Sequence, residues 1–260
     1  MSAPSNGHAI YDRLLATAHR KGAGFIVLID PDKLPEDKLP GFAARCAEAG
    51  VDALFLGGSL MHAAALDRYI HALAAATDLP VIGFPGTLTQ ISGALDAVLY
   101  LSVVSGRNPE HLIGQHVHAA PMIKRLGIEP IPTGYMLVES GRMTTAQYMS
   151  GSIPLPRNKP EIAAATALAA EMMGMRLLFT DGGSGAEHPV SEEIIAAITQ
   201  TCSAPLVVGG GLKTPAEVAR KVAAGARFIV VGNAIEQNGD TAYIADLAAA
   251  AHTAVPQPLG

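Results

Sequence analysis

Short, continuous apolar runs recur along the chain and alternate with segments of helical character. Runs of this kind, which lack an apolar–polar alternation, are typical of parallel strands that are covered on both faces. Most are followed by a helix with a recognisable start; Thr214-Pro215-Ala216-Glu217 has the form of a capping box with proline at the first helical position. Eight strands are predicted: Gly24–Asp30, Asp52–Gly57, Pro80–Phe84, Ala97–Val103, Ile131–Val138, Arg176–Thr180, Pro205–Val208 and Arg227–Val231.

Eight strand–helix units in a chain of 260 residues predict an α/β fold of the TIM-type (βα)8 barrel. We expect residues 1–260 to form a single barrel domain, in which the stretch 1–23 supplies an N-terminal helix that closes the bottom of the barrel. Residues 140–174 form a long insert between strands 5 and 6. Long loops at the catalytic face of a barrel are often lids or substrate walls, and we expect this insert to be one.

The connection between the third and fourth strands is unusually short. Only Pro85–Asp96 is available there, and because a regular crossover needs about a dozen residues including its helix, almost none are to spare. We therefore predict that the third helix is missing or replaced by an extended segment, which would leave a gap in the barrel wall. A short irregular helix of one turn is the alternative.

Composition narrows the classes of function. The chain is 49% hydrophobic and 16% charged, which suffices for one large core, and its net charge of −5 without a Lys/Arg block argues against nucleic-acid binding. Cys46 and Cys202 lie far apart and form no C-x-x-C pair, which argues against a disulfide or a zinc site. No apolar run reaches the roughly 20 residues that span a bilayer. We therefore expect a soluble, cytoplasmic protein without a transmembrane segment.

Three glycine-rich turns follow strands in the last third of the chain. Glycine tolerates positive φ and lets a ligand approach the backbone amides. Three such turns at the carboxyl ends of neighbouring strands would form a cup of N–H donors suited to a phosphate. The turns are Phe179-Thr180-Asp181-Gly182-Gly183-Ser184-Gly185, Gly209-Gly210-Gly211 and Gly232-Asn233.

Asp30 and Ser59 follow the first and second strands, which would place them side by side on the catalytic face. A carboxylate and a hydroxyl are ligands that suit Mg²⁺, which usually completes its shell with water and substrate phosphates. The alternative is that the two residues only cap the turn and helix that follow them.

Asp181 lies beside the glycine cup, where it would accept a hydrogen bond from a substrate hydroxyl or act as a general base. The alternative is a carboxylate that only stabilises its turn. Tyr135 and Glu139 flank the fifth strand and would reach the same cavity if Tyr135 points inward. His116 and His118 are two residues apart on a predicted helix, so they diverge and do not form a metal site.

Taken together, these motifs resemble the geranylgeranylglyceryl phosphate synthase family, also called phosphoglycerol geranylgeranyltransferases, and related heptaprenylglyceryl phosphate synthases. The resemblance runs nearly end to end and is greatest to the branch found in some archaea and Bacteroidetes-like bacteria. The matching segments are Leu28-Ile29-Asp30-Pro31-Asp32-Lys33, Leu56-Gly57-Gly58-Ser59, Gly83-Phe84-Pro85-Gly86, Ile131-Pro132-Thr133-Gly134-Tyr135, Gly183-Ser184-Gly185-Ala186, Gly209-Gly210-Gly211 and Gly232-Asn233.

The resemblance implies a barrel without its third helix and a prenyltransferase that joins sn-glycerol 1-phosphate to geranylgeranyl diphosphate through an ether bond. It implies Mg²⁺ on Asp30 and Ser59, with the prenyl tail in the gap of the barrel wall. The residues implied for glycerol phosphate are Tyr135, the segment Phe179 to Gly185, Gly210, Gly211, Gly232 and Asn233.

One departure from this family concerns the acceptor site. The family usually has Tyr-Leu-Glu where this chain has Phe179-Thr180-Asp181, so the carboxylate is one methylene shorter and a tyrosine hydroxyl is lost. This difference would alter the contacts with the glycerol hydroxyls. Asp181, which would orient and deprotonate the attacking hydroxyl, and Asp30 are the expected catalytic residues.

Two other functions fit a phosphate-binding barrel. One is an enzyme of the sugar-phosphate isomerase type, against which the short third crossover argues. The other is a non-catalytic binder of phosphorylated lipid precursors. A prenyltransferase acting on phosphoglycerate would need a cationic partner for the carboxylate, and the sequence places no obvious arginine in the cup. Besides the two substrates, we expect at most transient contact with a membrane surface, and homo-oligomers packed through Ala-rich helices.

Overall fold

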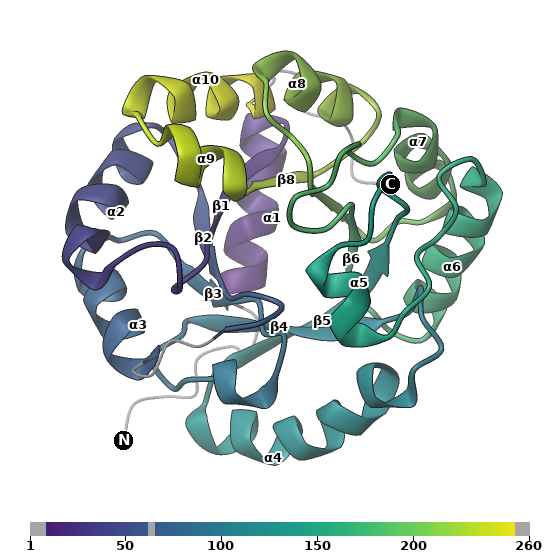
Figure 1. Cartoon of the computed structure of the whole chain (residues 1–260), viewed down its shortest axis with the longest axis horizontal. Coiled ribbons are helices and arrows are strands. Elements are labelled where there is room, and N and C mark those ends of the chain that lie inside the picture. Colours follow the sequence, from purple (N-terminus) through teal and green to yellow (C-terminus); the bar gives the residue numbers. More distant parts are fainter. Residues whose placement is uncertain (1–8, 62–65, 253–260) are drawn as a thin grey trace.

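The eight strands of the chain close into a parallel barrel around which the helices are arranged (Figure 1). This computed structural model describes residues 9–61 and 66–252. The strands follow one another around the barrel in chain order, and β8 pairs with β1. All eight predicted strands are present, with ends that differ from the prediction by at most two residues. They are β1 (Gly24–Ile29), β2 (Ala53–Leu56), β3 (Val81–Gly83), β4 (Ala97–Val103), β5 (Glu129–Leu137), β6 (Leu177–Asp181), β7 (Leu206–Gly209) and β8 (Phe228–Val231).

The helices begin where the sequence supplies caps. Thr214 accepts a hydrogen bond from the amide of Glu217, and the Glu217 carboxylate accepts one from the amide of Thr214, which confirms the predicted capping box. The α-helices are α1 (Ala9–Lys21), α2 (Leu39–Glu48), α3 (Leu66–Ala75), α4 (Gln115–Leu126), α5 (Thr145–Ser150), α6 (Pro160–Met172), α7 (Glu192–Thr201), α8 (Pro215–Ala223), α9 (Asn233–Asn238) and α10 (Thr241–Ala251). Short 3₁₀ turns, η1 (Glu36–Lys38) and η2 (Leu88–Gln90), and a π turn, η3 (Glu110–Gly114), complete the set.

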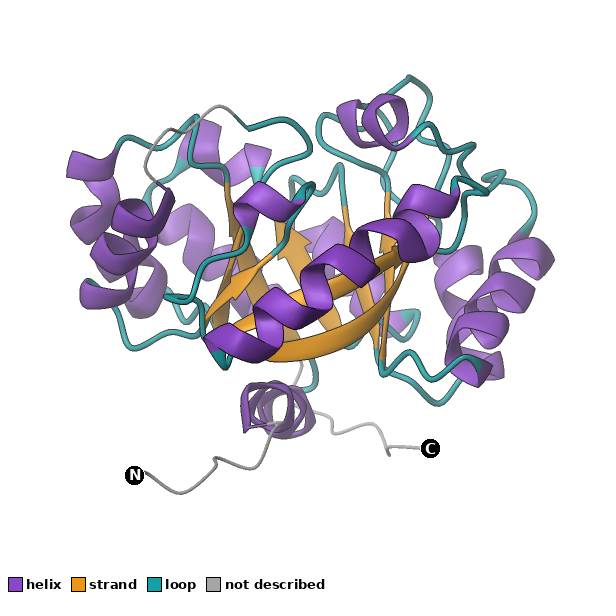
Figure 2. Cartoon of the chain, turned by 90° about the horizontal axis from the view of Figure 1, so that it is seen from below, coloured by secondary structure: helices purple, strands orange, loops and turns teal. Residues whose placement is uncertain are grey.

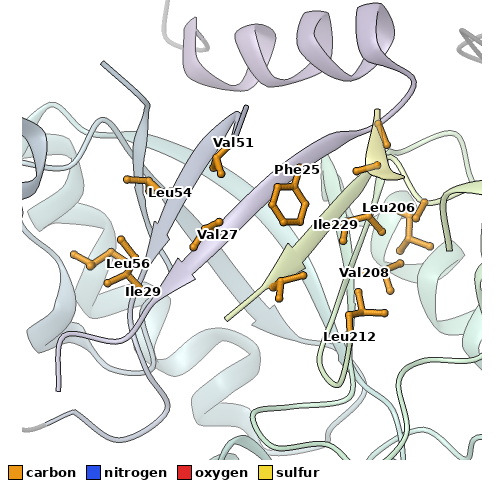
Figure 3. Packing of buried hydrophobic residues seen from close by; sticks show 14 of the residues in the cluster. Phe25, Val27, Ile29, Val51, Leu54, Leu56, Leu206, Val208, Leu212 and Ile229 are labelled. Atoms are coloured by element: carbon orange, nitrogen blue, oxygen red, sulfur yellow. The ribbon is translucent and has the colours of Figure 1, made fainter. Parts of the chain in front are cut away.

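The core has two layers, because successive side chains of a strand point to opposite faces. Ile26 and Phe55 fill the barrel interior. Phe25, Val27 and Ile29 of β1 point outward and pack with outward-facing residues of neighbouring strands beneath the helices (Figure 3). Both faces of each strand are therefore buried, which is why the strands appear in the sequence as unbroken apolar runs.

Helix α1 lies across the lower end of the barrel (Figure 2). Its residues Tyr11, Leu14 and Ala18 are buried against the side chains of the barrel interior. The Glu129 carboxylate at the start of β5 accepts hydrogen bonds from the amides of Ile10 (2.7 Å) and Tyr11 (3.0 Å). These bonds satisfy amides of the first helical turn, which lack a partner within the helix.

The crossover from β3 to β4 contains no α-helix, in agreement with its length. The third helix is therefore missing, as predicted, and a single 3₁₀ turn, η2, stands in the crossover in place of an extended strand. The buried amide of Gln90 explains the turn, because it accepts from the amide of Gly86 (3.0 Å) and donates to the carbonyl of Gly58 (2.8 Å). These two bonds hold the crossover against the ends of β2 and β3.

The insert after β5 contains α5 and α6. Its first half returns to the barrel through a bridge between Val138 and Leu155. Helix α5 lies above the barrel end opposite α1 (Figures 1 and 2), which is the position predicted for a lid or wall. Among the described residues, no helix has the length and apolar character that a membrane crossing requires.

The packing of α1 leads to a prediction for stability. Leu14→Ala should lower the free energy of unfolding by about 2–5 kcal/mol, because it removes a buried side chain and leaves a cavity under the barrel. Urea denaturation measures this change. His19→Ala, on the exposed side of the same helix, is the control and should change stability by no more than about 0.5 kcal/mol. Equal stability of the two variants would contradict the role of α1.

Candidate functional site

A cavity of about 780 Å³ lies at the carboxyl ends of the strands. Polar groups from the loops after β1, β2, β6, β7 and β8 line one part of it. The other part is apolar and extends over β4 toward α4. A single cavity thus combines a polar and an apolar region, both positioned by the rigid barrel.

The glycine-rich turns form the predicted cup at the polar part. Four glycines adopt positive φ values that other residues rarely take: Gly183 (86°), Gly185 (75°), Gly210 (80°) and Gly211 (77°). Within the described residues, the amides of Ser184, Gly185, Gly210 and Gly211 donate no hydrogen bond to a protein group. Because these residues line the cavity, their free N–H groups are available to an anion.

Gly210 shows how tightly the cup is built. A Cβ atom there would lie 2.5 Å from Oδ1 of Asp181 and 2.7 Å from the amide nitrogens of Gly182 and Gly183. Any side chain at position 210 would therefore displace both the loop after β6 and the carboxylate beside it. Asn233 completes the cup across the cavity, where its side-chain amide donates to Oγ of Ser184 (3.0 Å).

Thr180 and Gly182 do not line the cavity, contrary to the prediction. Thr180 points to the outer layer, where its hydroxyl donates to the carbonyl of Val207 (3.4 Å). The amide of Gly182 donates to the carbonyl of Gly209 (3.2 Å) and continues the pairing of β6 with β7. The physical reason is the two-residue alternation of a strand, which turns every second residue of this segment away from the site.

Asp181 and Tyr135 form a buried pair at the floor of the cup. The Tyr135 hydroxyl donates to Oδ2 of Asp181 (2.7 Å), and the amide of Gly183 donates to Oδ1 (2.7 Å). Burial raises the pKa of Asp181, although both hydrogen bonds oppose the shift. Burial, reinforced by the adjacent carboxylate, raises the pKa of the Tyr135 phenol well above its usual value, so the phenol stays a donor. A carboxylate with a raised pKa is suited to accept a proton near neutral pH.

An aromatic cluster buries this pair. Phe179 is fully buried, stacks on Phe84 with ring centroids 5.3 Å apart, and meets the ring of Tyr135 edge-on at 5.4 Å. Phe55 closes the cluster from β2. Phe179 thus contributes no hydroxyl to this region, and the phenol beside Asp181 is that of Tyr135. Glu139, in contrast, is exposed and lies outside the cavity, so the prediction that it reaches the site is wrong.

Asp30 and Ser59 line the cavity together, as predicted. The bare Cα of Gly86 allows the loop after β3 to approach this pair closely, since a Cβ there would lie 2.7 Å from the carbonyl oxygen of Gly58 and 3.2 Å from Cα of Ser59. Oδ1 of Asp30 accepts from the amide of Asp32 (3.1 Å), and Oδ2 forms an ion pair with Lys33 (3.3 Å).

These donors suit Mg²⁺ bound together with a substrate. Within residues 9–61 and 66–252, no cluster of three or more His, Cys, Asp or Glu side chains is arranged to hold a metal. One carboxylate and one hydroxyl beside an open cavity nevertheless match the habit of Mg²⁺, which takes few protein ligands and completes its shell with water and phosphate oxygens.

The apolar part of the cavity occupies the place of the missing helix. Its wall combines the outer face of β4 with η2 and one side of α4. His116 belongs to this wall; burial lowers the pKa of its imidazole, which is therefore neutral, while His118 on the same helix is exposed. The two histidines diverge, as predicted. The other residues of this wall include Leu88, Ile91, Val98, Tyr100, Ala119 and Ile123, with the polar side chains of His111 and Gln115 beside them.

Three polar residues of the site were not found from the sequence. Arg142 reaches from the insert to the cup, where its Nε donates to the carbonyl of Gly185 (2.6 Å), so the expectation of a cup without arginine is wrong. Lys33 contacts Asp30, and Gln90 holds the loops of Gly58 and Gly86. Each also makes a contact between segments far apart in the chain, which for Lys33 is the one with Glu236. The only signal for Lys33 was its place in the motif that follows Asp30.

Comparison with known proteins agrees with this geometry. A sequence-family model described as "PcrB family" matches residues 17–250. The chain belongs to the PcrB family. The geranylgeranylglyceryl phosphate synthase of Chitinophaga pinensis is 45% identical over 247 residues, which covers 95% of this chain and 97% of that protein. The protein of the same name from Spirosoma linguale is 47% identical and covers 83% of this chain and 87% of that one.

A solved structure supports the same assignment. It is (S)-3-O-geranylgeranylglyceryl phosphate synthase from Thermoplasma acidophilum in complex with sn-glycerol-1-phosphate. That structure superposes with a TM-score of 0.87 at 31% identity and covers 92% of this chain and 96% of that one. Membership of this family confirms the resemblance drawn from the strand-end motifs.

The buried Asp181 leads to a prediction about pH and stability. Because its pKa is raised in the folded state, the folded protein binds a proton more readily than the unfolded chain, and stability falls as pH rises above the unfolded value of about 3.9. Asp181→Asn removes this titration. Its free energy of unfolding, relative to that of the natural protein, should therefore increase between about pH 4 and pH 8.

Urea denaturation across this pH range measures the effect. Asp37→Asn is the matched control, because Asp37 is exposed, and its difference from the natural protein should stay constant with pH. A decrease in the relative stability of Asp181→Asn as pH rises would show that Asp181 is stabilised as a carboxylate.

Proposed function

We propose that the protein is a geranylgeranylglyceryl phosphate synthase. It transfers the geranylgeranyl group from its diphosphate to the free primary hydroxyl of sn-glycerol 1-phosphate, forms an ether bond and releases diphosphate. One observation carries the proposal. A single cavity joins the glycine-rich cup to the apolar part over β4, here called the apolar arm, and the buried carboxylate of Asp181 lines the same cavity. The names of the relatives, and the acceptor bound in one of them, support it.

The cup would hold the acceptor. The phosphate accepts hydrogen bonds from the free amides of Ser184, Gly185, Gly210 and Gly211, and such preorganised donors lose little free energy to reorganisation. Asp181 then accepts the proton of the attacking hydroxyl, while the Tyr135 phenol and the Gly183 amide keep the carboxylate in place. Arg142 lies beside Gly185, at the phosphate end of the cup, so it serves the phosphate. This position does not favour a role of Arg142 as the cationic partner of the carboxylate in a phosphoglycerate acceptor.

The opposite part of the cavity would hold the donor. Asp30 and Ser59 would bind Mg²⁺, and the ion would neutralise part of the negative charge that develops on the leaving diphosphate. The apolar arm over β4 would bury the prenyl chain at roughly 0.8 kcal/mol for each methylene removed from water. Phe84 and Phe179 shield the junction from water, so that the acceptor hydroxyl is the nucleophile at the allylic carbon.

The two alternative functions explain less of the cavity. A sugar-phosphate isomerase would use the cup but has no use for a long apolar arm. A passive binder of lipid precursors would not need a buried carboxylate with a raised pKa, because burying it costs stability. The prenyltransferase uses all three features.

We also infer a cytoplasmic homo-oligomer that contacts membranes only to exchange lipid. Exposed apolar residues on α6 and at its C-cap, namely Ile162, Met172 and Met173, support contact between copies of the chain. Tyr148 and Ile153, exposed around α5 near the mouth of the cavity, would allow transient contact with a membrane surface.

The metal site leads to a prediction about activity. Asp30→Ala should lower Mg²⁺-dependent formation of the ether product by about 10²-fold or more, because a bound metal contributes several kcal/mol to transition-state stabilisation. Product formation from both substrates across a Mg²⁺ titration measures this. Asp37→Ala removes an exposed carboxylate nearby and should keep normal activity. Turnover by Asp30→Ala at the natural rate would exclude Asp30 as the ligand.

The apolar arm leads to a second prediction. Ala119 is buried on the arm wall, whereas its neighbour Ala120 is exposed on the same helix. Ala119→Phe should lower kcat/KM for geranylgeranyl diphosphate about tenfold or more. The added ring would displace a few methylenes of the prenyl chain from the apolar arm, and each methylene left in water costs about 0.8 kcal/mol. Ala120→Phe is the matched control. If both variants behave alike in steady-state kinetics, the prenyl chain does not lie against α4.

A further inference from the structure

Lys33 places one positive charge between two parts of the cavity. The donor half contains Asp30, Ser59 and the apolar arm, and the acceptor half is the glycine-rich cup with Asn233. Lys33 lies in the loop after β1, and its ammonium is within hydrogen-bonding or ion-pair distance of Oδ2 of Asp30 (3.3 Å), Oδ1 of Asn233 (3.1 Å) and Oε2 of Glu236 (3.0 Å). An ammonium has three donors, so these three acceptors use all of them. Asp30 belongs to the donor half and Asn233 to the acceptor half, while Glu236 anchors the amine on α9.

The contacts continue into the cup. Asn233, which accepts from Lys33, donates from its side-chain amide to Oγ of Ser184 (3.0 Å). A polar path therefore runs from Asp30 through Lys33 and Asn233 to Ser184. Every member of this path lines the cavity, and the path joins the loops after β1, β8 and β6.

The charges along this path explain why a cation is needed. Asp30 and Glu236 are two carboxylates at the mouth of a cavity that would receive two phosphorylated substrates. Lys33 neutralises one of these charges, and its flexible side chain, which is 44% exposed, lets the ammonium change partners. An arginine fork has a fixed planar geometry and would match three separate acceptors less well.

We propose that Lys33 is a positioning residue that couples the binding of the two substrates, an inference that rests on the proposed function. When the Asp30 carboxylate binds a cation in the donor half, Lys33 loses one of its three hydrogen-bonding partners. The freed N–H of Lys33 is then available to the acceptor phosphate, which lies beside Asn233. Occupation of the donor half therefore strengthens acceptor binding, and by linkage the acceptor strengthens donor binding by the same factor.

Calorimetric titration with sn-glycerol 1-phosphate tests this coupling. The titration is run on the full chain alone and again with Mg²⁺ and geranylgeranyl thiolodiphosphate, a donor analogue that resists ionisation. The natural protein should bind the acceptor about fivefold more tightly or better in the second condition. Lys33→Met should bind it equally in both, and Lys33→Arg should retain part of the difference.

Lys38→Met is the matched control, because it removes an exposed positive charge from the same loop region but lies outside the cavity. It should keep the coupling of the natural protein. Equal coupling in Lys33→Met and the natural protein would overturn the proposal, and so would the absence of coupling in the natural protein. Lys33→Gln provides a second variant should the methionine variant fold poorly, which thermal melting reveals. Turnover of the natural protein with both substrates tests the function separately, so failure of the coupling alone leaves the function standing.

Discussion

The short connection between β3 and β4 is the constraint on which the site depends. A segment confined to Pro85–Asp96 returns to the start of β4 through the 3₁₀ turn η2 and without an α-helix, so the cavity extends against the outer face of β4 there. Gln90 fixes the segment by bonding Gly58 and Gly86, the same loops that border Ser59. The missing helix thus creates the apolar arm, and the residues that replace it shape the polar wall of the donor half.

The second physical feature is the burial of Asp181. A carboxylate in an aromatic surrounding is costly unless it is hydrogen-bonded, and Tyr135 and Gly183 supply two bonds that reduce this cost without removing it. The remaining shift of its pKa makes Asp181 a better proton acceptor than an exposed carboxylate. The Asp181 side chain places its carboxylate within reach of both donors on the floor of the cup.

Much of the fold follows from the sequence because both faces of every strand are buried. Phe25 and Ile26, which point to opposite layers, are both apolar, so the strand is visible as an unbroken run. The cup was also predictable, since positive φ at Gly210 and Gly211 requires glycine. The direction of individual side chains was harder to predict, and Thr180 lies on the face of β6 turned away from the site.

Long-range contacts were the part that the sequence could not supply. Lys33 meets Glu236 because closure of the barrel pairs β8 with β1, and Arg142 meets Gly185 because the insert returns over the cup. Such contacts depend on barrel closure and loop direction, for which local patterns carry no signal. They nevertheless distribute the positive charge in a site that would receive two phosphorylated substrates.

The most direct test is analysis of the product formed from geranylgeranyl diphosphate and each enantiomer of glycerol phosphate in the presence of Mg²⁺. We expect mass spectrometry to detect an alkali-stable ether, geranylgeranylglyceryl phosphate, with sn-glycerol 1-phosphate and much less with the sn-3 enantiomer. If neither enantiomer is alkylated by the natural protein, the cup and the apolar arm do not form the two halves of a prenyltransferase site.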